Sequence, residues 1–335
     1  MPRSTHAALL TAPRGAVEIR PVDVLDPGPR EVLVSMEACG VCHSDVFVTG
    51  LAKLPRTPLT LGHEGIGRIE AVGPDVVDLR TGDRVGITFL GWTCGECIYR
   101  RSGRERFCPK QKNTGYTLDG AMAGYAIVDA RQVIQVPEDA DATTVAPLCC
   151  AGWTAYGALR EAAVGTNGTI AVYGYGGLGQ LALQYGLAQG LKIAVADVSE
   201  MKLERARAAG AFLAAPAQDS GRTLQKQLGG VDAAIVFTSS TEAMEQAIKS
   251  VKRTGTVILV GLTTRDLAIS ITEVILKGIR IAGSFLGTRE DLQTVFRLGA
   301  QGIRPATETF SLDEAPEILL KLGRGEIAGR AVISF

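Results

Sequence analysis

The stretch Val172–Gln180, which reads VYGYGGLGQ, decides the fold of the second half of this chain. It places Gly174, Gly176 and Gly179 in the spacing G-x-G-x-x-G, between the apolar run TIAVYG and the helical pattern LGQLALQYGLAQG. The first glycine permits a tight turn, the second lets the backbone approach a pyrophosphate, and the third lets the helix pack closely on the strand. The helix N-terminus favours phosphate charge. The stretch therefore predicts a dinucleotide-binding loop, in which Gly177 is a further candidate for cofactor contact.

An acidic residue follows this loop at the spacing typical of dinucleotide-binding domains. The next apolar run ends in VADVS, which puts Asp197 about 20 residues further on. A carboxylate at that position binds the ribose 2′-hydroxyl of NAD and repels the 2′-phosphate of NADP. The alternative is a glycine turn with only a structural role. The flanking strand and helix patterns, the glycine spacing and the acidic residue all favour a dinucleotide site instead. We therefore expect NAD(H) as the cofactor.

The remainder of the second half alternates strand and helix patterns. The strand-like runs KIAVADV, DAAIVF and TVILVGL are separated by the helical patterns MKLERARAAG and AMEQAIKSVKR. Such alternation predicts an α/β domain with a parallel, doubly wound sheet covered by helices on both faces.

The first 150 residues or so have a different texture. Short β-rich runs such as EVLVSMEACG, IGRIEAVGPDV and GDRVGITFL are interrupted by frequent Gly and Pro. This pattern indicates antiparallel, barrel-like structure. The closing section, from TREDLQTVFRLGAQG to GRAVISF, is mixed again, and we expect it to rejoin the first domain.

Composition restricts the classes of partner. A chain of 335 residues with 46% hydrophobic residues is long enough for two domains with separate cores. Its 35 basic and 35 acidic residues cancel and form no long block of one sign. The charge pattern of a nucleic-acid binder or an anionic-membrane binder is therefore absent, and small molecules are the expected partners.

Cysteine usage and the apolar runs bear on compartment. Seven cysteines are an odd number for a disulfide framework, and their clustering suits thiolate ligands in a reducing compartment. The first apolar run is too short for a signal-peptide core, and no run is long enough to span a bilayer. We expect a cytoplasmic location. The cysteines form three groups: Cys39 and Cys42; Cys94, Cys97 and Cys108; Cys149 and Cys150.

Three separated segments share metal-ligand chemistry. They are ACGVCHSD, LGHEGIGRIEAVGPDV and APLCCAGWTAY. Two thiolates and one imidazole around zinc leave the fourth tetrahedral position open to water or substrate, which is the composition of a catalytic rather than a structural site.

At these segments the chain resembles the zinc-dependent alcohol dehydrogenases of the medium-chain dehydrogenase/reductase family, in particular the bacterial and yeast-type enzymes. The resemblance extends over essentially the whole chain. It implies a β-rich GroES-like catalytic domain, a partly open barrel, over residues 1–151. A Rossmann NAD-binding domain over 152–285 is implied next, and a C-terminal segment, 286–335, that returns to the catalytic domain.

The resemblance also implies roles near the metal. Cys42, His63 and Cys150 are the implied ligands of one catalytic zinc, and Ser44 is implied to hydrogen-bond the substrate oxygen. The implied supporting residues are Asp45, which orients the His63 imidazole, and Glu64, which lies behind the metal or serves as an alternate ligand.

Further positions are implied to contact cofactor or substrate. They are His43 and Arg330 at the pyrophosphate, Thr154 beside the nicotinamide, Lys202 near the adenosine ribose, and Phe89 and Trp153 at the substrate pocket. An apolar alcohol or carbonyl compound suits two aromatic walls, although core packing alone could explain both aromatic residues.

Several of these cysteines have plainer interpretations. A single cysteine or histidine in a core is ordinary, and it is the joint match to the family signature that favours a metal. Cys39 and Cys42 also form a C-x-x-C pair, but the β-α-β context of a redox motif is absent around them. Spacing alone does not separate Cys149 from Cys150. The following CAG favours Cys150 by resemblance, which leaves Cys149 and Cys39 as packing residues.

The stretch CGECIYRRSGRERFC departs from the family pattern. The family's structural zinc lobe has four cysteines spaced C-x2-C-x2-C-x7-C, and here Cys94, Cys97 and Cys108 fit while Arg100 takes the third place. A guanidinium has no lone pair to offer and is permanently charged. We therefore expect this lobe to lack a structural zinc, with Arg100 paired to Glu96 or Glu105 or stabilising a thiolate.

A second departure is Phe47, where many relatives have a histidine that ends a proton relay. Phenylalanine transfers no proton, so release must use water, the ribose or another group. Either the relay histidine is dispensable, or the enzyme favours reduction or a reaction with other proton demands.

The sequence thus predicts a zinc- and NAD(H)-dependent alcohol dehydrogenase that interconverts primary or secondary alcohols with aldehydes or ketones. Two alternatives stay open: an NADH-dependent reductase of conjugated C=C bonds, and a non-catalytic nucleotide-binding relative. By analogy with relatives, a homo-oligomer, either dimer or tetramer, joined largely through the sheet edge of the nucleotide-binding domain, is expected.

Overall fold

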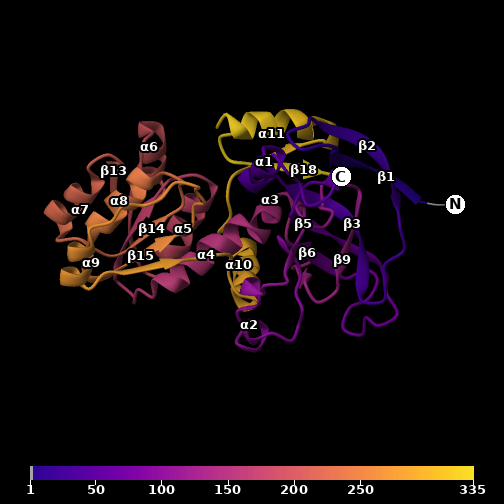
Figure 1. Cartoon of the computed structure of the whole chain (residues 1–335), viewed down its shortest axis with the longest axis horizontal. Helices are drawn as coiled ribbons and strands as arrows, with labels where there is room; N and C mark the ends of the chain where they lie inside the picture. Colours follow the sequence, from indigo (N-terminus) through magenta and orange to yellow (C-terminus); the bar gives the residue numbers. More distant parts are fainter. Residues whose placement is uncertain (1–2) are drawn as a thin grey trace. The chain divides into compact units, whose positions relative to one another are not determined.

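The computed structural model describes residues 3–335, which divide into two compact units (Figure 1). One unit contains the chain up to Trp153 and the segment Thr288–Phe335, and the other contains Thr154–Gly287. None of the helices described is long and apolar enough to cross a membrane.

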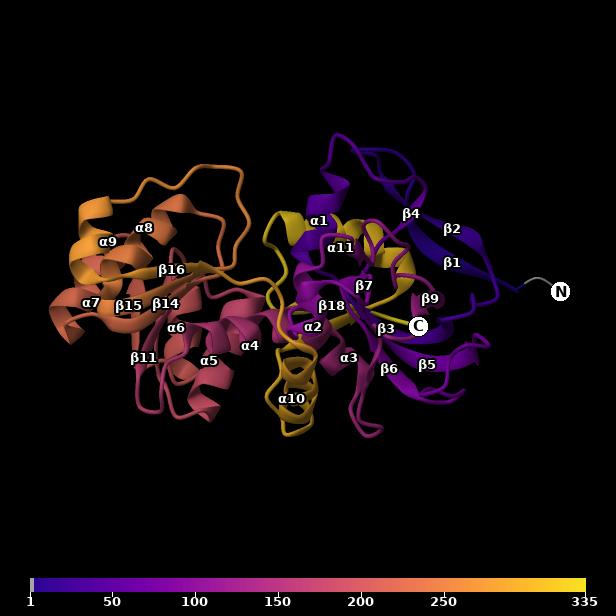
Figure 2. The same ribbon diagram turned by 60° about the horizontal axis from the view of Figure 1, so that its bottom comes forward.

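The second unit holds a six-stranded sheet in which every neighbouring pair is parallel, in the order β13-β12-β11-β14-β15-β16. Strands β11, β14, β15 and β16 are labelled in Figure 2. The strands of the sheet are β11 (Thr169–Tyr173), β12 (Lys192–Asp197), β13 (Leu213–Pro216), β14 (Val231–Val236), β15 (Val251–Leu259) and β16 (Arg280–Gly283). Counted from β11, this is the strand order 3-2-1-4-5-6 of the dinucleotide-binding doubly wound fold. The predicted α/β sheet is therefore confirmed.

Helices connect these strands. They are α4 (Ala151–Ala162), which begins in the first unit, α5 (Gly177–Ala188), α6 (Glu200–Ala208), α7 (Ser220–Leu228), α8 (Thr241–Ser250) and α9 (Ile271–Lys277).

The strands are buried on both faces, as parallel strands between helix layers require. In β11, Ala171 and Tyr173 join a core with Leu224 of α7 and Met244 of α8. On the other face α5 approaches closely enough that a Cβ at Gly186 would lie 2.5 Å from a side-chain carbon of Ile193 in β12. This packing holds the start of α5 at the carboxyl end of β11.

The first unit is β-rich. Its seven-stranded sheet has the order β10-β6-β5-β3-β18-β17, with β9 also paired to β3, and a three-stranded sheet has the order β2-β1-β4. The strands are β1 (Arg3–Leu10), β2 (Val17–Val24), β3 (Glu31–Gly40), β4 (Leu59–Thr60), β5 (Glu64–Val72), β6 (Arg84–Ile87), β9 (Tyr125–Asp129), β10 (Ile134–Gln135), β17 (Thr307–Phe310) and β18 (Arg330–Ser334). A further two-stranded sheet pairs β7 (Leu90–Trp92) with β8 (Lys112–Asn113).

Short helices fill the connections of this unit. They are α1 (His43–Thr49), α2 (Ile98–Arg101), η1 (Glu105–Phe107), α3 (Ala142–Val145), η2 (Ala146–Cys149), α10 (Arg289–Ala300), η3 (Leu312–Glu314) and α11 (Ala315–Gly323).

The register around β3 places the carboxyl end of the chain beside its amino-terminal half. Gly40 at the end of β3 pairs with Glu64 of β5 on one side and with Val332 of β18 on the other. Residues more than 260 positions apart are thereby brought together where the neighbouring inner strands β5, β3 and β18 meet at their ends. The candidate metal site lies at these strand ends.

Candidate active site

Cys42 occupies the N-cap of α1, directly after β3. The backbone N–H of Cys42 donates to Oδ2 of Asp45 at 2.8 Å, so the carboxylate satisfies an amide that the helix leaves unpaired. The turn before it has little room, because a Cβ at Gly40 would lie 2.1 Å from Oε2 of Glu64. Local helix capping therefore fixes the position of the Cys42 thiol.

Asp45 also holds His63. Its Oδ1 accepts from the backbone N–H of Gly62 at 3.2 Å and lies 3.1 Å from Nδ1 of His63. Both side chains are buried, at 1% and 2% exposure, and the carboxylate assigns the Nδ1 hydrogen to this contact. Nε2 of His63 is buried and has no hydrogen-bond partner among the described residues. A buried ring nitrogen left over in this way fits a metal ion.

Four potential ligand side chains converge around this nitrogen. The ligand atoms of Cys42, His63, Glu64 and Cys150 all lie within 4.8 Å of one another. Contact with Cys150 lowers the pKa of the Cys42 thiol well below its ordinary value, and the same contact raises the pKa of Cys150. Two thiolates so close together require a cation between them, and two sulfurs with one imidazole suit zinc. The donor set thus fits a zinc ion.

The two neighbouring cysteines lie outside this cluster. Cys39 and Cys149 are fully buried, and their thiols contact the backbone carbonyls of Gly40 and Gly65, each at 3.5 Å. Burial raises the pKa of both thiols. Their environment is that of packing residues, as expected from the sequence.

Glu64 and Arg330 form a buried ion pair that the sequence alone did not indicate. Nη2 of Arg330 donates to both carboxylate oxygens of Glu64, at 2.5 and 2.6 Å, and the side chains are 5% and 0% exposed. Burial raises the pKa of Glu64, and the guanidinium opposes that shift. No sequence signal pairs residues 64 and 330, because the register of β3 with β5 and β18 creates the contact. The predicted pyrophosphate role of Arg330 stays a prediction.

The face of α1 beside the cluster carries three further candidates. Oγ of Ser44 lies 3.7 Å from Sγ of Cys42 and is half-buried, so it is accessible beside the metal site. His43 is exposed. Phe47, which replaces the family's relay histidine, is 59% exposed. An apolar ring this exposed offers a contact surface but carries no proton donor at position 47.

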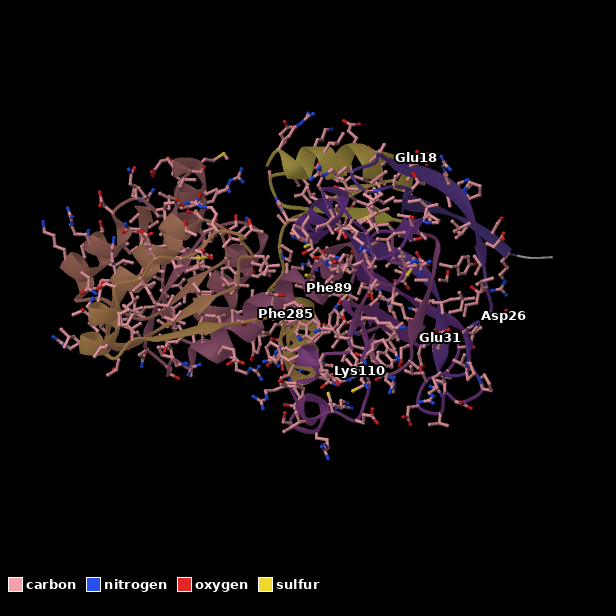
Figure 3. All side chains as sticks on the ribbon, in the orientation of Figure 1. Glu18, Asp26, Glu31, Phe89, Lys110 and Phe285 are labelled. Atoms are coloured by element: carbon pink, nitrogen blue, oxygen red, sulfur yellow. The ribbon has the colours of Figure 1, made fainter. Side chains whose placement is uncertain are left out.

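The two aromatic pocket candidates differ in environment. The half-buried ring of Phe89, labelled in Figure 3, meets the His63 ring edge to face, with centroids 5.3 Å apart at 75°. Trp153 is 4% exposed, and its Nε1–H donates to the backbone carbonyl of Thr288 at 2.7 Å. Phe89 therefore lies beside the candidate metal site, whereas Trp153 joins the two ends of the first unit where the chain leaves and re-enters it.

The glycine loop has the local geometry that its motif predicts. Gly174 has a φ of +92°, which favours glycine, and a Cβ at Gly179 would lie 2.1 Å from the carbonyl oxygen of Gly174. A Cβ at Gly176 would meet nothing within 4 Å, so the space above that residue is open. Gly177 begins α5. The open space at a helix N-terminus fits the phosphates of a nucleotide.

Asp197 ends β12, the strand beside the loop. Its Oδ2 accepts from the backbone N–H of Tyr175 at 2.7 Å, and its Oδ1 accepts from that of Ser199 at 3.0 Å. The carboxylate thus shapes the glycine loop, and its predicted contact with a ribose stays a prediction. Lys202 is half-buried on α6, and Thr154 is buried on α4.

The lobe formed by residues 94–108 has three of the four sulfurs of a structural zinc site. Sγ atoms of Cys94, Cys97 and Cys108 lie within 4.8 Å of one another. A hydrogen bond from the Glu96 backbone is the main cause that lowers the pKa of Cys94 to about 7. Nε of Arg100 pairs with Glu105 at 3.0 Å, one of the two partners expected. The fourth ligand position has no donor from Arg100, so the residues do not complete a closed zinc site.

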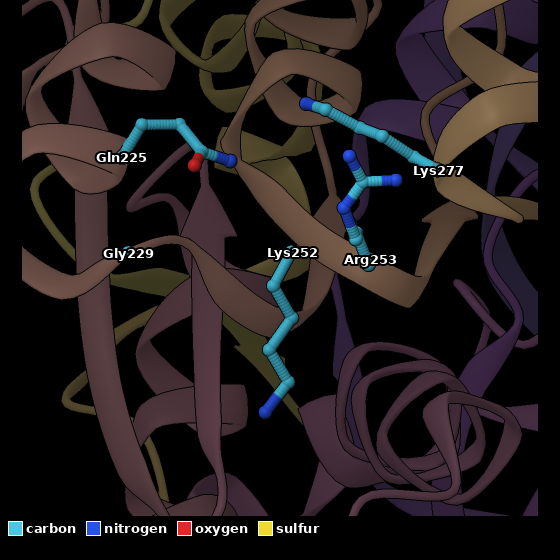
Figure 4. A pocket seen from close by; sticks show the side chains of 5 residues that line it. All are labelled: Gln225, Gly229, Lys252, Arg253 and Lys277. Atoms are coloured by element: carbon cyan, nitrogen blue, oxygen red, sulfur yellow. The ribbon is translucent and has the colours of Figure 1, made fainter.

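A basic depression of about 400 Å³ lies at the end of the parallel sheet opposite to the glycine loop (Figure 4). Its cations already have partners: Lys252 with Asp232, Arg253 with the Leu276 carbonyl and Lys277 with Glu273. Ligands of open parallel sheets bind at the carboxyl ends of the strands, where the glycine loop lies. The depression is therefore not the nucleotide site.

Comparisons with known families cover both units. Residues 28–138 match the family described as alcohol dehydrogenase GroES-like domain, and residues 177–301 match the family described as zinc-binding dehydrogenase. Together they include the candidate ligands Cys42 and His63 and the glycines that begin α5.

Individual relatives match over nearly their full length. An alcohol dehydrogenase of Geobacillus stearothermophilus is 41% identical over 332 residues, covering 98% of each chain. The crystal structure of the alcohol dehydrogenase from Aeropyrum pernix is 31% identical with a TM-score of 0.90, covering 98% of this chain and 100% of that one. Acetophenone reductase from Geotrichum candidum, solved with NAD, is 30% identical with a TM-score of 0.87, covering 100% and 98%.

Proposed function

This chain belongs to the zinc-binding alcohol dehydrogenases of the medium-chain dehydrogenase/reductase family, and from that premise we propose that it interconverts primary or secondary alcohols with aldehydes or ketones, using NAD(H) and one catalytic zinc. The observation that supports this most is the buried cluster of Cys42, His63 and Cys150, with Nε2 of His63 left unpartnered among the described residues. Three such ligands leave a coordination position for an alcohol or carbonyl oxygen.

Zinc bound at this cluster supplies Lewis-acid chemistry, which stabilises negative charge on an alcohol or carbonyl oxygen. The residues of the chain hold the geometry. Asp45 fixes the tautomer and the orientation of His63. Ser44, whose Oγ lies 3.7 Å from Sγ of Cys42, is proposed to hydrogen-bond the substrate oxygen and pass its proton onward. Because Phe47 carries no proton, transfer beyond Ser44 runs to water or to the cofactor ribose.

The Glu64–Arg330 pair balances charge behind the cluster. A carboxylate oxygen of Glu64 lies within 4.8 Å of the ligand atoms of the two cysteines and the histidine, yet both of its oxygens accept from Arg330. Because the Glu64 carboxylate is paired with the Arg330 guanidinium, it contributes negative charge near the metal without binding it. The thiolates of Cys42 and Cys150 and the imidazole of His63 serve as the ligands.

NAD(H) supplies the hydride chemistry, and the second unit has the features that select it. The glycine loop offers open space at the start of α5, and Asp197 stands beside it with a carboxylate that disfavours a 2′-phosphate.

One zinc per chain is proposed rather than two. The lobe of residues 94–108 provides three sulfurs, and Arg100, which stands in place of the missing fourth cysteine, is paired with Glu105. Four arginines and two glutamates in this segment also leave it with positive charge that opposes a divalent cation.

Carbonyl and C=C reduction are separated by one assay. NADH oxidation is followed with a saturated ketone and with the matching conjugated enone, and the products are identified. We expect turnover of the saturated ketone to the alcohol and, in the reverse direction, NADH formation from the alcohol. Consumption of NADH with the enone alone, giving the saturated carbonyl compound, would contradict the proposal. Tight NADH binding without turnover of any alcohol or carbonyl compound would favour a non-catalytic role.

A homo-oligomer is also proposed, formed through an apolar surface on the second unit. This surface, the α9 face, consists of Leu262, Ile269, Ile271, Ile275 and Leu276. Helix α9 has no buried residue, and its apolar side chains Ile271, Ile275 and Leu276 are 62% to 69% exposed. The neighbouring strand β16 is an edge strand, which a second copy can extend around a two-fold axis (Figure 2).

Replacing Ile275 by glutamate places a charge in the middle of the α9 face. We expect this variant to lower the mass measured by size-exclusion chromatography with light scattering, because a buried unpaired charge weakens an apolar interface. Val77→Glu is the control, since Val77 is an exposed apolar residue of the other unit. An unchanged mass for Ile275→Glu would exclude this face as the interface.

A further inference from the structure

The lobe of residues 94–108 combines close thiols with an incomplete ligand set. Sγ of Cys108 and Sγ of Cys94 lie 3.6 Å apart, and Sγ of Cys97 lies within 4.8 Å of both. Arg100 is 52% exposed and directs its guanidinium to Glu105. Three thiols therefore lie as close together as metal ligands do. Arg100, which stands in place of the missing fourth cysteine, points its guanidinium to Glu105 and cannot bind a metal.

The surroundings of these sulfurs favour thiol chemistry over a divalent cation. Arg131 also approaches the lobe: its Nη2 donates to the carbonyl of Thr93 at 3.4 Å, and its Nη1 would lie 3.0 Å from a Cβ at Gly95. Guanidinium groups near a sulfur stabilise its thiolate form, which is the nucleophile in thiol oxidation.

We propose that Cys94 and Cys108 form a reversible disulfide when the protein meets a hydroperoxide, so that this lobe is an oxidation site instead of a structural zinc site. The sulfurs need to approach by about 1.5 Å to reach bonding distance. Cys94 lies in the loop that precedes α2, and Cys108 is the C-cap residue of η1, so neither sulfur is held inside a helix or strand and a shift of this size is small. The proposal does not depend on the catalytic cluster.

The two steps are chemically balanced with hydrogen peroxide as oxidant. Cys94 is partly exposed and Cys108 is 1% exposed, so peroxide reaches the Cys94 thiolate first. Cys94 releases its proton, and the thiolate attacks one peroxide oxygen so that the O–O bond breaks. This gives a sulfenic acid and hydroxide, and the hydroxide takes up the released proton to become water. The Cys108 thiol then attacks the sulfenic sulfur, forms the S–S bond and expels a second water. Two thiols and one peroxide become one disulfide and two waters.

Cys97 has a separate task in this arrangement. It stays a free thiol within 4.8 Å of the other two sulfurs. A thiolate at that distance can attack the disulfide and pass it to a reductant by exchange. The exchange gives an external dithiol a second route to the bridge, so the site reopens faster than a bridge isolated from other thiols would.

The test is a peptide map of the zinc-loaded protein after treatment with a few equivalents of hydrogen peroxide. Free thiols are alkylated, the chain is digested without reduction, and cross-linked peptides are identified by mass spectrometry. We expect a peptide containing Cys94 joined to Cys108, loss of two alkylatable thiols, and recovery of both after dithiothreitol. The result is read on the wild-type chain and is independent of enzymatic activity.

Two variants sharpen the assignment. Cys97→Ser should still form the cross-link but show slower reopening by a dithiol, whereas Cys108→Ser should form no cross-link involving Cys94. Retention of all three lobe thiols after peroxide would overturn the proposal. A bound zinc that is lost on replacing Cys108 and that protects the three thiols from alkylation would overturn it as well.

Discussion

The Cys150→Ala variant should lose its bound zinc and retain about a thousandth or less of the wild-type kcat/KM for alcohol oxidation. Cys150 is one of three ligands at the buried cluster, and its removal leaves Cys42 and His63, which are too few to hold zinc against dissociation. The loss of Lewis-acid stabilisation corresponds to several kcal/mol of transition-state free energy, and each ~1.4 kcal/mol is a factor of ten in rate. Bound zinc and steady-state kinetics are measured on the same preparation.

Cys149→Ala is the matched control, because Cys149 is adjacent in sequence, fully buried and outside the cluster. It should keep its zinc and most of its activity, with a stability loss of about 1 kcal/mol from the small cavity. The assignment of ligands would be wrong if the two variants behaved alike, or if only Cys149→Ala lost zinc.

The Asp197→Asn variant should lower the preference for NAD⁺ over NADP⁺ by about 100-fold, or ~3 kcal/mol. The change removes the charge that favours a ribose 2′-hydroxyl and repels a 2′-phosphate, while the amide oxygen keeps one acceptor for the backbone N–H groups of Tyr175 and Ser199. Values of kcat/KM for both cofactors, with thermal unfolding of the free protein, give the effect on selection and on stability.

Glu200→Ala controls for the removal of a nearby negative charge. Glu200 begins α6, is exposed and pairs with Arg207 at 2.8 Å. It should leave the cofactor preference within about twofold of wild type, since an exposed ion pair contributes little. If Asp197→Asn lost stability but kept the wild-type preference, Asp197 would be a residue that shapes the loop and does not select the cofactor.

The features that are set by short stretches of sequence could be predicted from the sequence alone. The turn at Gly174 and the close packing at Gly179 follow from the spacing of glycines between a strand and a helix, and the doubly wound sheet follows from alternating patterns. Arg100 was expected to lack ligand chemistry because of its guanidinium, and its pairing with Glu105 was one of two short-range options.

Contacts set by strand register could not be predicted in this way. Arg330 contacts Glu64 because β3 pairs with both β5 and β18. No sequence pattern in β5 or β18 predicts that pairing. The same holds for Trp153, whose indole N–H finds the carbonyl of Thr288. For Asp45, the resemblance indicated its partner His63, but its bonds to the amides of Cys42 and Gly62 emerged only with the folded chain.

Zinc K-edge X-ray absorption on the protein, purified without added metal and quantified for zinc, measures the ligands directly. We expect about one zinc per chain with two sulfurs at ~2.3 Å and two nitrogen or oxygen neighbours at ~2.0–2.1 Å, the shell of Cys42, His63, Cys150 and one open position. A shell of three or four sulfurs would place the zinc in the lobe of residues 94–108 and contradict a catalytic zinc at the buried cluster.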